Sequence, residues 1–231
     1  MIGGRMTIKR GKKDEAEKPF WISFADLMTA LMVLFLLVMS VALLAVTSKD
    51  EENKHEQDIC TLIQQIDTIG ADQGIHTDCK RRVIDFGDRA RFDTGSYQLS
   101  NEQTQLLRAF VPKVLNVANN PMGQRLLKRI IVEGYTDQRG SYLYNLNLSS
   151  QRSQRVLCAF FEPPTTTETP LTTKDMEDVR RLFLVGGFSS NSTKATLEES
   201  RRIELRLEFF GLNEKPTTVK LPEGNFGKCA I

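Results

Sequence analysis

The run FWISFADLMTALMVLFLLVMSVALLAV, residues 20–46, decides how this chain is organised. It contains one charged side chain, Asp26, and neither glycine nor proline. A bilayer core about 30 Å thick is crossed by about 20 apolar helical residues, so this run is long enough to span a membrane. A cleaved secretory signal has a shorter apolar core, and a buried helix of a soluble protein would carry a polar face. The run therefore predicts a retained transmembrane helix over residues 20–46.

The charges on either side of this span predict its orientation. Residues 1–19 are rich in Lys and Arg, whereas acidic residues predominate in 49–58, just after the span. Because Lys and Arg concentrate on the cytoplasmic side of membrane helices, we expect the tail 1–19 in the cytoplasm and all residues beyond the span outside it.

Composition narrows the class of protein further. Across 231 residues, 31 basic side chains nearly balance 29 acidic ones, which argues against a nucleic-acid binder. All four cysteines follow the span, and in an oxidising compartment they predict two disulfides with three possible pairings. The short separation favours Cys60–Cys79, which leaves Cys158–Cys229. The chain has no CxxC pair and 2 histidines, so we expect neither a metal site nor another cofactor.

Beyond the span the sequence predicts an α+β fold. In the segment 47–79, apolar residues recur at helical spacing from Ile59 to Ile69 and predict a short amphipathic helix that serves as a linker, a dimer contact or a helix packed on the next domain. Within 80–211 we expect strands at 82–86, 128–135 and 201–210 and helices at 100–117, 148–161 and 172–184. A Thr-rich insertion at 163–170 and a tail at 212–231 complete an α/β sandwich with helices on one face of its sheet.

Asp26 is the most unusual residue of the span. A carboxylate near the middle of a membrane helix costs about 2.5–3.5 kcal/mol on insertion scales, so such residues usually have a function. Helical spacing places Ser23, Thr29 and Ala30 on its face, and small or hydroxylated residues permit close helix contact. We interpret Asp26 as a carboxyl that faces a partner helix and exchanges a proton. The alternative is a carboxylate that reaches the cytoplasmic interface and has no role.

The pattern W-x-x-F-A-D-L-M-T-A-L-M-x-x-F, residues 21–35, resembles the transmembrane helix of MotB-type stator subunits of ion-driven motors. The resemblance implies that Asp26 is the proton carrier, and that Ser23, Thr29 and Ala30 line its path. It also implies a dimer of this chain enclosed by a ring of five MotA-like subunits.

A second string, VEGYTDQRGSYLYNLNLSSQRS at 132–153, resembles the OmpA-like peptidoglycan-binding domain. That domain has the pattern G-[HY]-T-D-x-x-G, then N-x-x-L-S-x-x-R, and a late R-R-x-E, which matches 201–204 here. The resemblance implies binding of the diaminopimelate stem peptide, with Asp137 and Arg152 as principal contacts. Arg201 is a weaker candidate, because an arginine at the start of a strand often only pairs with nearby acids.

The chemistry of these residues fits that ligand. Diaminopimelate presents an ammonium, which Asp137 can bind, and a carboxylate, which the Arg152 fork can hold with two hydrogen bonds. Thr136, Asn145 and the helix N-terminal amides expected near Ser149 add neutral donors. The alternative is an Asp137–Arg152 ion pair that only braces the loop against the helix.

Taken together, the two segments predict a membrane motor subunit anchored to the cell wall. The chain has no P-loop, no G-x-S-x-G and no paired catalytic acids with a histidine, so we do not expect an enzyme. Nearly the whole chain resembles the ZorB subunits of Zorya anti-phage defence systems, including DEAEKPFWIS at 14–23 and RRIELRLEFFGL at 201–212. That family implies a bacterial inner-membrane protein with a periplasmic domain, a ZorA ring partner, and ZorC and ZorD as cytoplasmic effectors. A flagellar motility stator and a purely structural tether are the alternatives.

Overall fold

The structure is a computed structural model that describes residues 14–164, 170–216 and 224–231. Most of the expected cytoplasmic tail, the centre of the Thr-rich insertion and part of the C-terminal tail lie outside these residues. The chain forms two units, Met1–Asn53 and Lys54–Ile231, and helix α1 (Asp14–Gly70) begins in the first and ends in the second. From Ser23 onward α1 is long and apolar enough to cross a membrane. Its large apolar side chains between Phe24 and Val46 are exposed, as suits a lipid-facing helix.

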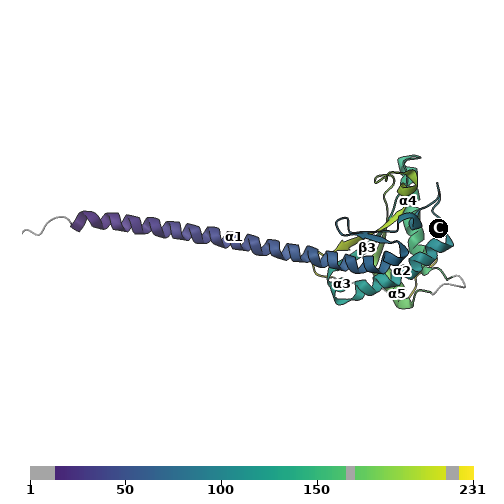
Figure 1. Cartoon of the computed structure of the whole chain (residues 1–231), viewed down its shortest axis with the longest axis horizontal. Helices are drawn as coiled ribbons and strands as arrows, with labels where there is room; N and C mark the ends of the chain where they lie inside the picture. The colour runs from purple at the N-terminus through teal and green to yellow at the C-terminus, as the bar shows by residue number, and fades with distance from the viewer. Residues whose placement is uncertain (1–13, 165–169, 217–223) are drawn as a thin grey trace, which may run out of the picture. The chain divides into compact units, whose positions relative to one another are not determined.

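The second unit is built on a five-stranded sheet with the order β1-β2-β5-β3-β4. Strands β3 and β4 run parallel, and the other neighbours are antiparallel. The strands are β1 (His76–Asp78), β2 (Val83–Asp85), β3 (Leu127–Gly134), β4 (Phe183–Gly187) and β5 (Ile203–Phe209). The remaining helices, partly visible in Figure 1, are α2 (Asn101–Asn119), α3 (Pro121–Leu126), α4 (Tyr142–Phe161), α5 (Thr173–Leu182) and α6 (Leu197–Ser200), with 3-10 turns η1 (Ala71–Gln73) and η2 (Gly87–Ala90).

The two faces of the sheet have opposite chemistry. Along β5, Ile203, Leu205 and Leu207 are buried in the same core as apolar residues of α2, α4 and α5. Glu204 and Arg206 alternate with them, as the period of a strand requires, and join a network of charged side chains on the other face. The α+β class, with helices on one face of the sheet, is confirmed.

The end of α1 belongs to this core. Ile59, Leu62, Ile63 and Ile66 are at most 1% exposed and pack in the cluster formed by the sheet and the other helices. The amphipathic stretch is therefore a helix packed on the following domain, and it is the last part of α1 and not a separate short helix.

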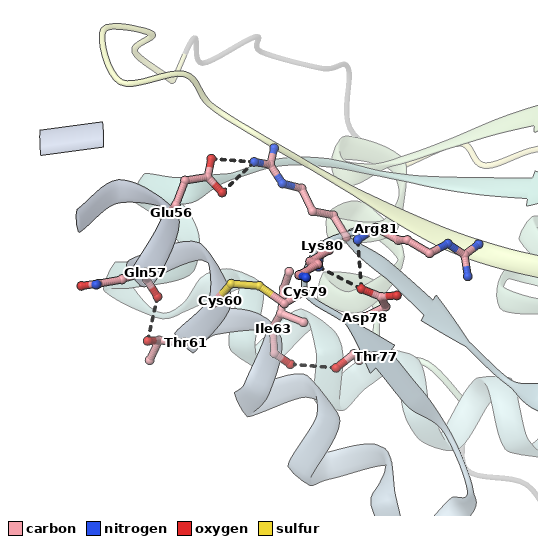
Figure 2. Close-up of a disulfide and its surroundings, with 11 residues drawn as sticks. Glu56, Gln57, Cys60, Thr61, Ile63, Thr77, Asp78, Cys79, Lys80 and Arg81 are labelled. Atoms are coloured by element: carbon pink, nitrogen blue, oxygen red, sulfur yellow. Dashed lines mark hydrogen bonds and ion pairs between the residues drawn. A yellow bond between two sulfur atoms is a disulfide. The ribbon is translucent and has the colours of Figure 1, made fainter. Parts of the chain in front are cut away.

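Polar and covalent contacts fasten this part of α1 to its neighbours. Figure 2 shows the disulfide between Cys60 on the helix and Cys79 just after β1. Close to it, Thr77 Oγ1 donates to the carbonyl of Ile63, and Glu56 forms an ion pair with Arg82 at 2.7 Å. A second disulfide joins Cys158 to Cys229, so the structure contains the pairing that the sequence favoured.

The predicted secondary structure was wrong at several points, and α3, β4 and α6 were not predicted. Helix α4 begins at Tyr142, capped by Ser141, and not near Leu148. The helix expected to run to residue 184 ends at Leu182, because Phe183–Gly187 pairs in parallel with β3. The three-residue strand β1 was not predicted, since its pairing with β2 depends on contacts that local periodicity does not reveal.

The buried face of α1 leads to a test of stability. Ile63→Ala removes buried methyl groups from the core of the second unit and should lower the free energy of unfolding by about 2–5 kcal/mol. Thr61→Ala, on the exposed side of the same helix turn, should change it by less than about 1 kcal/mol. Chemical denaturation of the 54–231 fragment measures both values, and equal effects would contradict the packing of α1 on this domain.

Candidate functional site

Two glycines shape the connection between β3 and α4. A Cβ atom on Gly134 would lie 2.0 Å from the carbonyl oxygen of Ser149, so only glycine lets α4 pass this close to the end of β3. Gly140 has a φ of +97°, a backbone conformation that side-chain-bearing residues rarely adopt. The two glycines of the G-x-T-D-x-x-G pattern therefore fix the ends of the loop that carries Thr136 and Asp137.

This loop forms one wall of a pocket of about 210 Å³. Five of the six residues proposed from the sequence to bind peptidoglycan line it together. The lining consists of Thr94, Gly95, Thr136, Asp137, Arg139, Gly140, Tyr144, Asn145, Leu148, Arg152 and Arg201. Thus residues from three distant stretches of sequence meet in one small cavity.

Ser149, the sixth proposed residue, lies outside this lining. It is fully buried, its hydroxyl donates to the carbonyl of Leu146, and its Oγ accepts the backbone N–H of Ser189 at 3.0 Å. Because α4 begins at Tyr142, the amide of Ser149 is inside the helix and not at its N-terminus. The expected group of free amides near Ser149 is therefore not present, and the residue ties α4 to the loop after β4.

Asp137 is the acid of the pocket and is 5% exposed. Its Oδ2 accepts from Nη2 of Arg139 at 2.7 Å and from Nη1 of Arg201 at 3.0 Å, and its Oδ1 accepts the backbone N–H of Arg139 at 3.0 Å. Burial by itself would raise the pKa of this carboxyl, but the hydrogen bonds from Arg139 and Arg201 outweigh it and hold the pKa below its ordinary value. Asp137 is thus a carboxylate at neutral pH.

Arg152 binds backbone carbonyls, whereas the alternative drawn from the sequence was an ion pair between Arg152 and Asp137. Its guanidinium is 0% exposed and donates to three backbone carbonyls, those of Ser96 at 2.9 Å, Tyr135 at 2.7 Å and Asp93 at 3.1 Å. Burial, aided by the charge of Arg201, lowers the pKa of Arg152 to about 10, so the group is still protonated at neutral pH. A guanidinium has five N–H donors, and Arg152 also lines the pocket.

Arg201 and Thr136 complete the polar lining. Arg201 precedes β5, and besides Asp137 it binds the carbonyl of Phe92 at 2.9 Å and Glu198 at 3.2 Å. Thr136 is 1% exposed, and its Oγ1 has no hydrogen-bond partner among the residues that the structure describes. A buried hydroxyl without a partner is costly, so this oxygen is well suited to a polar ligand atom.

Sequence reasoning missed Arg139, the residue that makes the shortest contact with Asp137. It occupies one of the variable positions of the T-D-x-x-G pattern, so the motif itself does not point to it. Thr94 and Tyr144 also line the pocket without having been singled out. The sequence does place Arg139 two residues after Asp137, and an arginine side chain can reach back across one residue to a carboxylate. This spacing could have indicated the contact.

In the first unit, the residues around Asp26 lie on one exposed helix. Thr29 Oγ1 donates to the carbonyls of Ala25 at 3.0 Å and Asp26 at 2.8 Å, which satisfies its hydroxyl within α1. Ser23, Asp26 and Ala30 are exposed. Their roles stay a prediction.

Known protein families match both the membrane segment of the chain and the domain that follows it. The OmpA family matches residues 91–202, and the family described as membrane MotB of the proton-channel complex MotA/MotB matches residues 6–56. Zorya protein ZorB of Escherichia coli O139:H28 (strain E24377A / ETEC) is 42% identical over 222 residues, which cover 93% of this chain and 90% of that protein. The chain belongs to the ZorB family. It thus combines a MotB-type N-terminal segment with an OmpA-family domain.

Solved structures with a similar fold are more distant from this ZorB-family chain. A MotB-like protein from Desulfovibrio vulgaris is 17% identical with a TM-score of 0.45, over 68% of this chain and 98% of that one. The OmpA-like domain of FopA1 from Francisella tularensis is 18% identical with a TM-score of 0.34, over 56% of this chain and 75% of that one.

The contacts of Arg152 predict a large effect on stability. Arg152→Met removes a buried cation that binds three carbonyls and should lower the free energy of unfolding by about 3–5 kcal/mol. Arg125→Met, which breaks an exposed ion pair with Asp58, should cost less than about 1 kcal/mol. Urea denaturation of the two variants measures this difference, and a small effect at Arg152 would contradict its bracing role.

Proposed function

We propose that this chain is the peptidoglycan-anchored stator subunit of a proton-driven motor in the bacterial inner membrane, and that the motor acts in anti-phage defence. The observation that carries the proposal is the presence on one ZorB-family chain of two carboxylates, Asp26 in a MotB-type membrane segment and Asp137 in the pocket of an OmpA-family domain.

Asp26 carries the proton in this proposal. It is the one charged residue in the apolar run 20–46, and a carboxylate is costly in lipid when charged and far less so when protonated. Moving one charge through 100 mV releases about 2.3 kcal/mol, which can drive a conformational step in partner subunits. The small and hydroxylated residues Ser23, Thr29 and Ala30 allow partner helices to approach Asp26 and line the proton path.

The pocket provides the anchor. Asp137 binds the ammonium of the diaminopimelate stem peptide, Arg152, which lines the pocket, binds its carboxylate, and Thr136 and Asn145 contribute neutral contacts. Arg201 holds Asp137 from the protein side. An anchor of this kind keeps the chain still while proton flow turns its partners.

The partners follow from the same family. The chain forms a dimer inside a pentamer of ZorA-like, MotA-type subunits, with the N-terminus in the cytoplasm and residues beyond the span in the periplasm. The basic tail and the acidic stretch after the span support this orientation, and two disulfides suit an oxidising periplasm. ZorC and ZorD act downstream in the cytoplasm, without direct contact with the anchor domain.

The proton-carrier role predicts the outcome of one substitution. Asp26→Asn keeps the shape of the side chain but cannot be ionised, so it should abolish protection in a phage plaque assay while the chain still inserts and assembles with its ring partner. Asp50→Asn makes the same change further along α1, outside the apolar run, and should leave protection near wild type. Full protection by Asp26→Asn would leave only a structural tether.

The anchor role predicts a loss of binding without a loss of fold. Asp137→Asn removes the charge that attracts the ligand ammonium and should weaken co-sedimentation of the 54–231 fragment with purified peptidoglycan about tenfold. Asp72→Asn changes an exposed acid that does not line the pocket and should bind like wild type. Unchanged sedimentation of Asp137→Asn would refute the site, and a thermal melt verifies that both variants are folded.

A further inference from the structure

The pocket contains more positive than negative charge. Arg139, Arg152 and Arg201 all line it, whereas Asp137 is the one acid among its lining residues. Asp137 already accepts hydrogen bonds from two of these arginines. A ligand ammonium therefore does not meet an open carboxylate but has to compete with an arginine for it.

The three arginines differ in how firmly they are held. Arg152 is fully buried and binds three backbone carbonyls. The Arg201 side chain is 10% exposed and also binds a backbone carbonyl and Glu198. The Arg139 side chain is 52% exposed, and its guanidinium contacts Asp137 and the hydroxyl of Thr94, at 3.1 Å. Arg139 can thus leave Asp137 at far lower cost than Arg201, the other arginine that binds it.

We propose that Arg139 is a displaceable latch on Asp137 that makes the pocket select ligands bearing a carboxylate next to their ammonium. When the ligand ammonium takes the place of the Arg139 guanidinium on Asp137, the released guanidinium pairs with the ligand carboxylate. This inference rests on the proposed peptidoglycan binding and names the residue that sets its specificity.

The exchange increases the number of ion pairs only for one class of ligand. If the ligand has both charges, one internal pair is replaced by two pairs across the interface. If its carboxylate is amidated, Arg139 loses Asp137 and gains no charged partner. The backbone N–H of Arg139 still donates to Asp137 Oδ1 in either case, so the carboxylate stays oriented while the side chain moves.

The same contacts explain why Asp137 needs a latch. Asp137 lies in a cavity next to Arg152 and Arg201. A buried carboxylate of this kind is stable only when several N–H groups donate hydrogen bonds to its oxygens. Arg139 supplies two side-chain hydrogen bonds to Oδ2 from the solvent side, at 2.7 and 3.2 Å, and so takes the position that a ligand ammonium would occupy. Arg139 thus stabilises Asp137 while the site is empty. An incoming ligand has to bind strongly enough to displace Arg139 from Asp137.

The test compares two ligands that differ by one charge. The full-length chain in detergent is titrated calorimetrically with the stem tripeptide that ends in meso-diaminopimelate, and with the same tripeptide amidated on the side-chain carboxylate. Wild type should prefer the carboxylate form about tenfold. Arg139→Gln should lower the ratio of the two Kd values severalfold, chiefly by weakening the carboxylate form, while Arg152 still favours a ligand carboxylate. Arg89→Gln, an exposed arginine outside this pocket, should keep the wild-type ratio.

The outcomes separate this inference from the function on which it rests. If both tripeptides bind and Arg139→Gln keeps the wild-type preference, or weakens both ligands by the same factor, the latch is refuted and the anchor site stands. If neither tripeptide binds wild type, the peptide-binding function is overturned and the latch with it. A change in the ratio is not expected from a merely structural role, because loss of fold weakens both ligands equally.

Discussion

The buried guanidinium of Arg152 is the interaction on which the pocket depends. It joins α4 to the carbonyls of Asp93 and Ser96 and to that of Tyr135, just after β3, and it stacks 4.9 Å from the ring centroid of Phe92. A cation without exposure to water is stable only when its donors are satisfied, and backbone carbonyls do this without adding a second buried charge. Arg152 therefore holds α4, Tyr135 and the loop 93–96 together beside the pocket before any ligand arrives.

The charges on the face of the sheet opposite the apolar core serve a different purpose. Glu133 and Glu204 are directly opposite each other on β3 and β5, and each is compensated by arginines. Tyr135 donates to Glu133, and burial with this hydrogen bond raises the pKa of the phenol above its ordinary range. In that network every acid has a fixed partner, which suits a structural role. In the pocket, by contrast, one partner of Asp137, Arg139, has a half-exposed side chain.

The sequence predicts those parts of this domain that local patterns determine, and it misses those that depend on contacts between distant residues. The capping boxes at Ser100 and Thr172 are local, and both helices begin where these residues predict. The sequence motif likewise pointed to Asp137 and Arg152, which line one pocket, and its two glycines have steric roles. Strand β4 was missed because its parallel pairing with β3 decides its conformation. The contact between Arg139 and Asp137 was missed because a motif marks shared positions, whereas this arginine occupies a variable one.

The two carboxylates to which we assign functions, Asp26 and Asp137, place opposite demands on their surroundings. Asp137 has its partners within its own domain, so its charge is stable there, as the proposed role in recognition requires. Asp26 lies on an exposed part of a single helix, and no ion pair with it occurs among the described residues. In lipid such a carboxylate is stable only when it is neutral or when other chains surround it. In the function that we propose, the membrane half therefore needs partner subunits for its chemistry, whereas the pocket needs only its own domain, so substitutions should disable the two halves separately.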